Sequence, residues 1–291
     1  DAQLFGTTEL IKDDGFHEIN SLIQKDLMAW AGVSAALVAN SVISGNRAGY
    51  GAGLAMTNSV QVYDSAVYGN QAVEQVGGAF MLFGGALTVS RTAVYSNSAS
   101  GTTVPVGGAG YVQGGAVVRL INATVSGNAA GNSSAFHVVG GSALWMTATT
   151  LANNTSLLSP PAIAFSVGAS VRATQSLFAG GSGCAAPISD GGYNVDIGAS
   201  CFSAPTTTLI NQAGALVNPL AFNGGSNPYN WTHSLPAVNP ALSLVPFASC
   251  QVADDQRGVT RPQPATSSRC DAGAYESDVL GARAWIPIAL R

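Results

Sequence analysis

One short pattern of residues returns along the chain at nearly regular intervals. The motif Gly-Gly-Ala begins at Gly77 and again at Gly107, and each copy leads through an apolar segment to an asparagine. The asparagines that close these segments are spaced by 24, 27, 31 and 26 residues: Asn46, Asn70, Asn97, Asn128 and Asn154. In the next copy Gly181 stands in place of the asparagine. Repeats of this length cannot bury an apolar face alone, so they must stack on their neighbours.

Apolar residues occupy fixed positions before each asparagine and before Gly181. Ten and eight residues earlier stand the pairs Ala36/Val38, Val60/Val62, Leu87/Val89, Val118/Leu120, Leu144/Met146 and Val171/Ala173. Three residues earlier stand Ile43, Val67, Val94, Val125, Leu151 and Phe178. The period of two in the first set is typical of a strand with one face in the core.

This pattern predicts an all-β fold, a parallel β-helix solenoid of about six to seven rungs. Each strand would pair in parallel with the equivalent strand one rung away, about 4.8 Å distant. The crossover rule for parallel strands predicts a right-handed winding. Glycine pairs beginning at Gly84, Gly114 and Gly140 precede the strands and predict corners with positive φ.

The recurring asparagine has two physical explanations. Its side-chain amide can bond the backbone and the asparagine of the next rung, which would satisfy polar groups that are otherwise unpaired. Alternatively, asparagine simply tolerates the left-handed conformation of a turn. The sequence leaves both open, and neither role is catalytic.

Composition and charge exclude several classes of function. Only 9% of residues are charged and the formal net charge is −4 without a basic patch, which argues against nucleic-acid binding. No apolar run approaches the roughly 18 residues of a membrane span. Asp1 begins a stretch unlike a signal peptide, so we expect a processed or trimmed start. A polar surface built from hydroxyls and amides favours an extracellular or cell-surface protein.

Four cysteines lie in the second half of the chain. They fall into two pairs by proximity, Cys184 with Cys201 and Cys250 with Cys270, and we predict these two disulfides among three possible pairings. Disulfides imply an oxidising compartment. The alternative is four buried free thiols. The spacing fits no metal site, and we expect neither a metal nor a cofactor.

The repeat divides the chain into four parts. Residues 1–35 form an N-terminal cap or first partial rung, 36–203 the rungs, 204–276 a C-terminal cap, and 277–291 an apolar tail. We expect the C-terminal cap to cover the end of the stack, because an open edge of parallel strands is a template for pairing.

The N-terminal part has two interpretations. An amphipathic helix is indicated by the spacing of Phe16, Ile19, Ile23, Leu27 and Trp30. Residues 27–31 also align with a later rung, and we favour a strand there. For residues 9–25 the sequence does not decide the secondary structure.

The C-terminal third carries motifs of a known family. Asn223-Gly224-Gly225 is followed by DQRGVTRP at 255–262 and by CDAGAYE at 270–276. The series resembles the choice-of-anchor Q domain proteins of bacteria, and with the rungs the likeness covers about residues 36–276. The chain departs from that family at 236–241, which reads PAVNPA, and in lacking its usual upstream cysteine motif. The rungs also resemble, more loosely, the repeats of chlamydial polymorphic outer-membrane proteins.

The resemblance implies a right-handed parallel β-helix, a secreted or surface location and a C-terminal anchoring element. The tail ends in apolar residues that include Trp285, Ile286, Ile288 and Leu290, and it resembles the endings of exported Chloroflexota proteins. It is too short to span a membrane. It could add as a strand to an exposed edge of a neighbouring copy, or pack along its own rod.

A catalytic β-helix would need two or three carboxylates on one outward face of adjacent rungs. The outward positions hold no such stack. Asp64 and Arg91 form the one expected charge pair, interpreted as a solvated ion pair. Arg119, Trp145 and Arg172 form a ladder that could bind a glycan or a partner's carboxylates, or could be plain surface.

Acidic residues also gather near the C-terminal cap. We interpret Arg257 and Arg261 as structural partners of Asp255, Asp271 or Glu276, in a clamp closed by the second disulfide. The spacing does not supply the oxygens of a calcium site. The three histidines, His17, His137 and His233, are scattered and match no catalytic or metal-binding spacing. We interpret most of the Asn-X-Ser/Thr sequons as chance occurrences in a chain rich in Ser, Thr and Asn; they begin at Asn122, Asn132, Asn153, Asn154 and Asn230.

The sequence therefore predicts a non-catalytic extracellular or cell-surface protein. It would be structural or adhesin-like, with self-association into a filament or sheath, or a surface or glycan partner. The alternative is a carbohydrate-active enzyme or glycan-binding module that uses the Arg119, Trp145 and Arg172 face.

Overall fold

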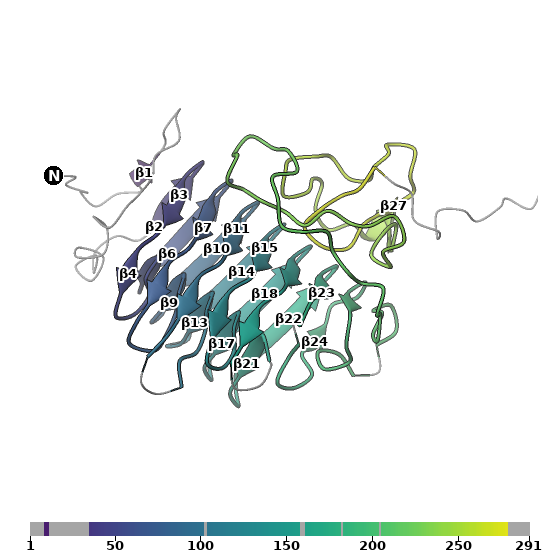
Figure 1. The fold of residues 1–291 in the computed structure, drawn as a ribbon. Helices are drawn as coiled ribbons and strands as arrows, with labels where there is room; N and C mark the ends of the chain where they lie inside the picture. Colours follow the sequence, from purple (N-terminus) through teal and green to yellow (C-terminus); the bar gives the residue numbers. More distant parts are fainter. Residues whose placement is uncertain are drawn as a thin grey trace, which may run out of the picture.

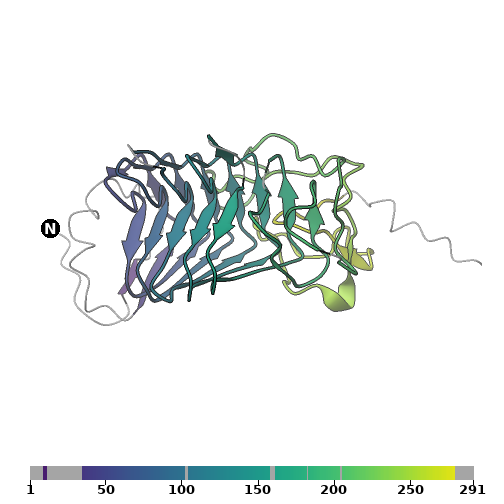
Figure 2. The same ribbon diagram turned by 90° about the horizontal axis from the view of Figure 1, so that it is seen from below.

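The computed structural model describes residues 9–11, 35–101, 104–157, 161–181, 183–203 and 205–278. These residues form a parallel β-helix whose turns stack along one axis (Figures 1 and 2), as the repeat predicted. Five complete turns each carry four strands, one in each of four parallel sheets, here called A to D. Partial turns at both ends account for the larger number of rungs expected from the repeat.

Sheets A and B carry the strands that the apolar pattern predicted. Sheet A contains β1 (Glu9–Ile11), β2 (Ala35–Ala39), β6 (Ser59–Tyr63), β10 (Ala86–Ser90), β14 (Val117–Ile121), β18 (Ala143–Thr147), β22 (Ser170–Thr174) and β24 (Ser189–Asp190). Sheet B contains β3 (Val42–Ser44), β7 (Ala66–Tyr68), β11 (Ala93–Tyr95), β15 (Thr124–Ser126), β19 (Thr150–Ala152), β23 (Leu177–Ala179) and β25 (Val195–Asp196).

Sheets C and D close each turn with shorter strands. Sheet C contains β4 (Arg47–Ala48), β8 (Gln71–Ala72), β12 (Ser98–Ala99), β16 (Ala129–Ala130) and β20 (Thr155–Ser156). Sheet D contains β5 (Leu54–Met56), β9 (Phe80–Leu82), β13 (Gly110–Val112), β17 (Phe136–Val138) and β21 (Ile163–Phe165). Outside the solenoid, β26 (Val245–Pro246) pairs antiparallel with β27 (Arg269–Cys270), and a 3-10 turn, η2, spans Phe247–Ser249.

The core is a stack of apolar ladders. Residues at the same position of successive turns are direct partners in the parallel register, as Leu87 is with Val118. The predicted apolar positions are buried, except that Ala36 and Val60 are half-buried in the first turns. Burial of each such side chain contributes roughly 1.5 to 3 kcal/mol.

The corners are built from residues with positive φ and from close backbone contacts. The glycine pairs confirm their prediction, with φ of +69° at Gly114 and +83° at Gly141. In the Gly-Gly-Ala motif, a Cβ on Gly78 would lie 2.2 Å from the carbonyl oxygen of Gly108 on the next turn. Only glycine permits this approach.

The asparagines form a buried ladder between sheets B and C. The Nδ2 of Asn70 donates to Oδ1 of Asn97 (2.9 Å) and to the carbonyl of Ile43 on the preceding turn (3.0 Å). The same bonds link all five asparagines from Asn46 to Asn154. The first explanation of the repeat is thus confirmed. The second is wrong, because the left-handed residue is the one before the asparagine, such as Gly69 with φ of +64°.

A second ladder of hydroxyls lies between sheets A and B. Ser41 donates its backbone N–H to Oγ of Ser65, whose N–H donates to Oγ1 of Thr92. Each hydroxyl then donates to the carbonyl two residues before it, as Thr92 does to Ser90. Ala123 interrupts this ladder, which resumes at Thr149, Ser176, Asn194 and Thr208.

Both predicted disulfides are present, and the first closes the end of the solenoid. Cys184 and Cys201 are joined at 2.12 Å, and Phe202 beside them packs its ring edge against Phe178 in the last turn, with centroids 5.5 Å apart. This loop, together with the bridge between Val195 and Leu209, extends the stack beyond β23. The alternative of four free thiols is therefore wrong.

Residues 205–278, here called the strap, fold back along the side of the solenoid. Figure 1 shows the strap beside β3, β7, β11 and β15. Asn227 donates to the carbonyl of Asp64 on the second turn, and Asn230 donates to that of Arg91 on the third. The expected cap therefore covers a long face of the rod as well as its end.

At the N-terminus, Glu9–Ile11 form a strand parallel to β2, within the stretch that the sequence left open. The favoured strand at 27–31 and the alternative helix from Phe16 to Trp30 lie outside the described residues. The apolar tail after Asp278 lies outside them too. None of the residues that the structure describes forms a helix able to cross a membrane.

Candidate functional site

The outward face of sheet A holds the ladder that the sequence singled out. The parallel register places Arg119 opposite Trp145, and Trp145 opposite Arg172. Ser189 of β24 continues this row next to Arg172. Because strands alternate their side chains, the neighbours of these residues in sequence point into the core. The sequence prediction that the three residues share one surface is thus met.

The indole of Trp145 stacks with a guanidinium. The Cζ atom of Arg119 lies 4.7 Å from the centroid of the Trp145 ring, within the range of a cation–π contact. Trp145 is nevertheless 40% exposed, and Arg172 is exposed as well. One guanidinium therefore steadies the indole while solvent still reaches the ring.

A depression of about 500 Å³ lies beside this row. Its floor comes from β18, β22 and β24, and it is lined by Trp145, Thr147, Ser170, Arg172, Ser189 and Gln251. Gln251 comes from the strap and is held by a hydrogen bond from its N–H to Oε1 of Gln175 (3.1 Å). The strap thus completes a wall that the repeat pattern alone could not have indicated.

The charges of this surface are not neutralised by neighbours. Among the described arginines, Arg91, Arg257 and Arg261 form ion pairs with carboxylates, whereas no described carboxylate pairs with Arg119 or Arg172. The row therefore places two unpaired positive charges around an aromatic ring, in a chain whose net charge is −4.

A second cluster lies at the corner between sheets A and B. Nε of Arg91 donates to Asp64 (2.9 Å), which confirms the expected pair, and Nη1 donates to Asp254 of the strap (2.7 Å). The prediction that this pair is solvated is wrong, because the side chains of Arg91 and Asp64 are only 21% and 12% exposed. Arg91 also stacks on Tyr63, with Cζ 4.6 Å from the ring centroid. Burial, followed by the charge of Asp64, raises the pKa of the Tyr63 phenol. The role of Asp254 was missed because it lies 163 residues from Arg91.

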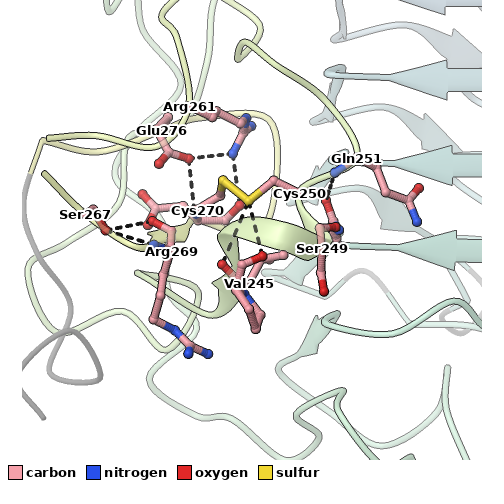
Figure 3. The surroundings of a disulfide bond; sticks show 12 residues. Val245, Ser249, Cys250, Gln251, Arg261, Ser267, Arg269, Cys270 and Glu276 are labelled. Carbon is pink, nitrogen blue, oxygen red and sulfur yellow. Dashed lines mark hydrogen bonds and ion pairs between the residues drawn. A yellow bond between two sulfur atoms is a disulfide. The ribbon is translucent and has the colours of Figure 1, made fainter. Parts of the chain in front are cut away.

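The acidic residues of the strap form the structural clamp that the sequence predicted. Arg257 pairs with Asp255, and Arg261 pairs with Glu276, both at 2.7 Å. Asp271 accepts hydrogen bonds from the N–H groups of Ser243 and Ser277. Figure 3 shows Arg261 and Glu276 beside the disulfide of Cys250 and Cys270. These groups are nearly all buried, which leaves them no access to a substrate.

The buried carboxyls of Asp271 and Glu276 both have raised pKa values. Burial, followed by the charge of Glu276, raises the pKa of Asp271 to about 8. Arg261 stabilises the ionised form of Glu276 through a direct ion pair. Burial also raises the pKa of Glu276, and the charge of Arg261 opposes that rise.

The structure also joins Ser126 to His233, a contact that the sequence did not suggest. Oγ of Ser126 lies 2.8 Å from Nε2 of His233, and Nδ1 lies 2.6 Å from the carbonyl of Asn218. Since a carbonyl only accepts, Nδ1 carries the proton and Nε2 accepts from Ser126. Burial lowers the pKa of His233. Both side chains are buried, so the pair fastens the strap to β15.

Other residues considered from the sequence hold the fold together. Asn122, Asn154 and Asn230 are buried and hydrogen-bonded, whereas Asn153 is exposed. The described residues include no group of three metal-ligating side chains. An aromatic cluster that the sequence did not reveal joins strap to rod, with Tyr95 stacked between Tyr68 (4.8 Å) and Trp231 (5.5 Å).

Comparisons with known proteins found no significant similarity to a family model, a curated protein or a solved structure. The resemblance of residues 223–276 to choice-of-anchor Q proteins therefore stays a prediction.

Proposed function

We propose that the protein is a non-catalytic extracellular or cell-surface rod with a structural or adhesin-like role. The observation that carries this proposal is the placement of the carboxylates. In the described turns, the outward row that holds Arg119, Trp145 and Arg172 has none. Asp64 and Asp254 at the corner of the sheet both bind Arg91, and Asp190 at the end of β24 accepts hydrogen bonds from Gly192, Asn194 and Thr208.

Hydrolysis or elimination on a polysaccharide requires an acid and a base with separate environments. The guanidinium of Arg91 lies between Asp64 and Asp254 and forms ion pairs with both, so both carboxylates are already engaged within the protein. The raised pKa of Tyr63 keeps its phenol protonated, which disfavours it as a base. This corner is better suited to fastening the strap than to catalysis.

The extracellular location is supported by two disulfides in a chain with no free cysteine among the described residues. Disulfides persist in oxidising compartments and are rare in the cytosol. A surface of hydroxyls and amides agrees with this location.

Turnover assays test the proposal. The purified protein is incubated with acidic and neutral polysaccharides, with and without calcium, and reducing ends and unsaturated products are measured. We expect no product above background. Turnover that the substitution Asp64→Asn abolishes would overturn the proposal and establish the alternative, a carbohydrate-active enzyme.

Self-association into a filament or sheath is a finer form of the same proposal. Within the described ranges, β3, β4 and β5 each pair with a strand on one side only. Open edges of parallel strands are templates for a further strand. Electron microscopy at high protein concentration is expected to show end-to-end rods, and strictly monomeric particles would contradict this form.

A further inference from the structure

We infer that the row of Arg119, Trp145 and Arg172 binds an acidic polysaccharide that lies across the strands, parallel to the solenoid axis. This inference rests on the proposed role as a non-catalytic surface protein, and it assigns the ligand of that protein. It draws on the charge, ring and polar groups of one continuous surface.

The charges select an anionic ligand. Arg119 and Arg172 stand two strand spacings apart, about 10 Å along the axis. Neither guanidinium pairs with a described carboxylate, although four other arginine–carboxylate ion pairs form elsewhere in the described chain. A guanidinium binds a carboxylate or sulfate through two parallel hydrogen bonds, so each arginine suits one acidic group of a repeating chain.

The ring selects a ligand with an apolar face. Trp145 is exposed on the strand between the two arginines, and Arg119 contacts its ring at 4.7 Å. An indole offers a flat apolar surface that favours the C–H face of a sugar ring. An inorganic anion has no such face and would leave Trp145 unused.

The polar lining distinguishes a glycan from a protein partner. Ser170, Ser189 and Gln251 line the depression beside Arg172, and all are donors and acceptors suited to sugar hydroxyls. A stable protein interface needs a buried apolar centre and about 800 Å² on each partner. On sheet A the exposed large apolar side chains are Tyr63 and Trp145 alone among described residues, which does not provide such a centre.

The test compares matched ligands and matched variants by isothermal calorimetry in low salt. The ligands are an oligogalacturonate and its methyl ester, which has the same rings without the charges. The variants are Arg172→Gln, Trp145→Ala and the control Arg47→Gln. Arg47 is an exposed arginine on sheet C, so its substitution makes the same change of charge on another face.

We expect the wild type to bind the acid at least tenfold more tightly than the ester, and to lose affinity as salt is raised. Arg172→Gln and Trp145→Ala are each expected to weaken binding at least tenfold, and Arg47→Gln less than twofold. Unchanged circular dichroism and melting temperature confirm that the variants are folded, since both side chains are exposed.

Three results would overturn the inference: no binding by the wild type, equal binding of acid and ester, or equal loss in Arg172→Gln and Arg47→Gln. None of these bears on catalysis. Turnover of a polysaccharide would instead overturn the proposed function, even where the row still binds its ligand. The two failures are therefore distinguishable.

Discussion

Each ladder asparagine satisfies backbone groups that no strand can reach. Asn97 accepts from the backbone N–H and the side chain of Asn70, and its own amide donates to Asn128 and to the carbonyl of Val67. All these groups are buried. A buried polar group without a partner costs about 1 to 3 kcal/mol, so the ladder is energetically required at every turn.

The substitution Asn97→Ala should therefore destabilise the protein by roughly 2 to 5 kcal/mol, because at least two buried groups lose their partner. Urea unfolding measures this loss. The control is Gln61→Ala, on the exposed face of β6, which should change stability by less than about 0.5 kcal/mol. Equal effects of the two substitutions would show that the ladder contributes nothing specific.

The raised pKa of Asp271 in the clamp predicts a pH dependence of stability. The pKa of Asp271 is about 8 in the folded protein, against 3.8 ordinarily, because of burial and the charge of Glu276. The folded state thus holds a proton that the unfolded chain releases. The stabilisation of the folded state by this proton is complete below about pH 4 and is lost as pH rises through about 8.

As pH rises from 5 to 8, the titration of Asp271 should reduce the free energy of unfolding by up to about 1.4 kcal/mol per pH unit. The variant Asp271→Asn cannot titrate and should show a flatter dependence, whatever its stability at one pH. Denaturant unfolding at several pH values gives both slopes. Equal slopes for the wild type and Asp271→Asn would show that Asp271 is not the group whose titration changes the stability.

At the scale of elements, the sequence predicted those strands whose pattern carries a strong signal. Sheet A follows from the apolar pair ten and eight residues before the asparagine, because a strand with one buried face repeats every second residue. Sheet B follows from the single strongly apolar position that recurs three residues before the asparagine in every turn. Strands of two or three residues in sheets C and D are too short to show a period. The hydroxyl ladder was also missed, since Ser, Thr and Ala alternate there and Ser and Thr occur throughout the chain.

The two disulfides should stabilise different elements. Cys250 and Cys270 close a loop of 20 residues within the strap, whereas Cys184 and Cys201 close one of 17 at the end of the solenoid. Each bond is expected to contribute about 3 kcal/mol. Replacing both cysteines of one pair by serine should raise hydrogen exchange around that pair. Exchange that rises in the same peptides for both double variants would contradict this division.

At the scale of the molecule, the strap joins turns that the solenoid connects only through neighbours. Asp254 binds Arg91, Gln256 binds Thr124 and Ala274 binds Thr150, so one segment fastens three turns. No sequence rule could pair these residues, because they lie 124 to 163 positions apart. A repeat alone would open turn by turn, whereas a fastened stack should open as a larger unit.

The substitution Trp231→Ala tests this coupling. Trp231 stacks on Tyr95 of β11, and removing the ring frees the aromatic cluster that joins strap and rod. Hydrogen exchange should then rise in β7 and β11 as well as in the strap, although these strands lie far away in sequence. Trp145→Ala is the matched control, because that indole faces solvent on sheet A and should leave these amides protected. If hydrogen exchange rose only in the strap after Trp231→Ala, the solenoid would be stable without the strap, and the strap would only cover its surface.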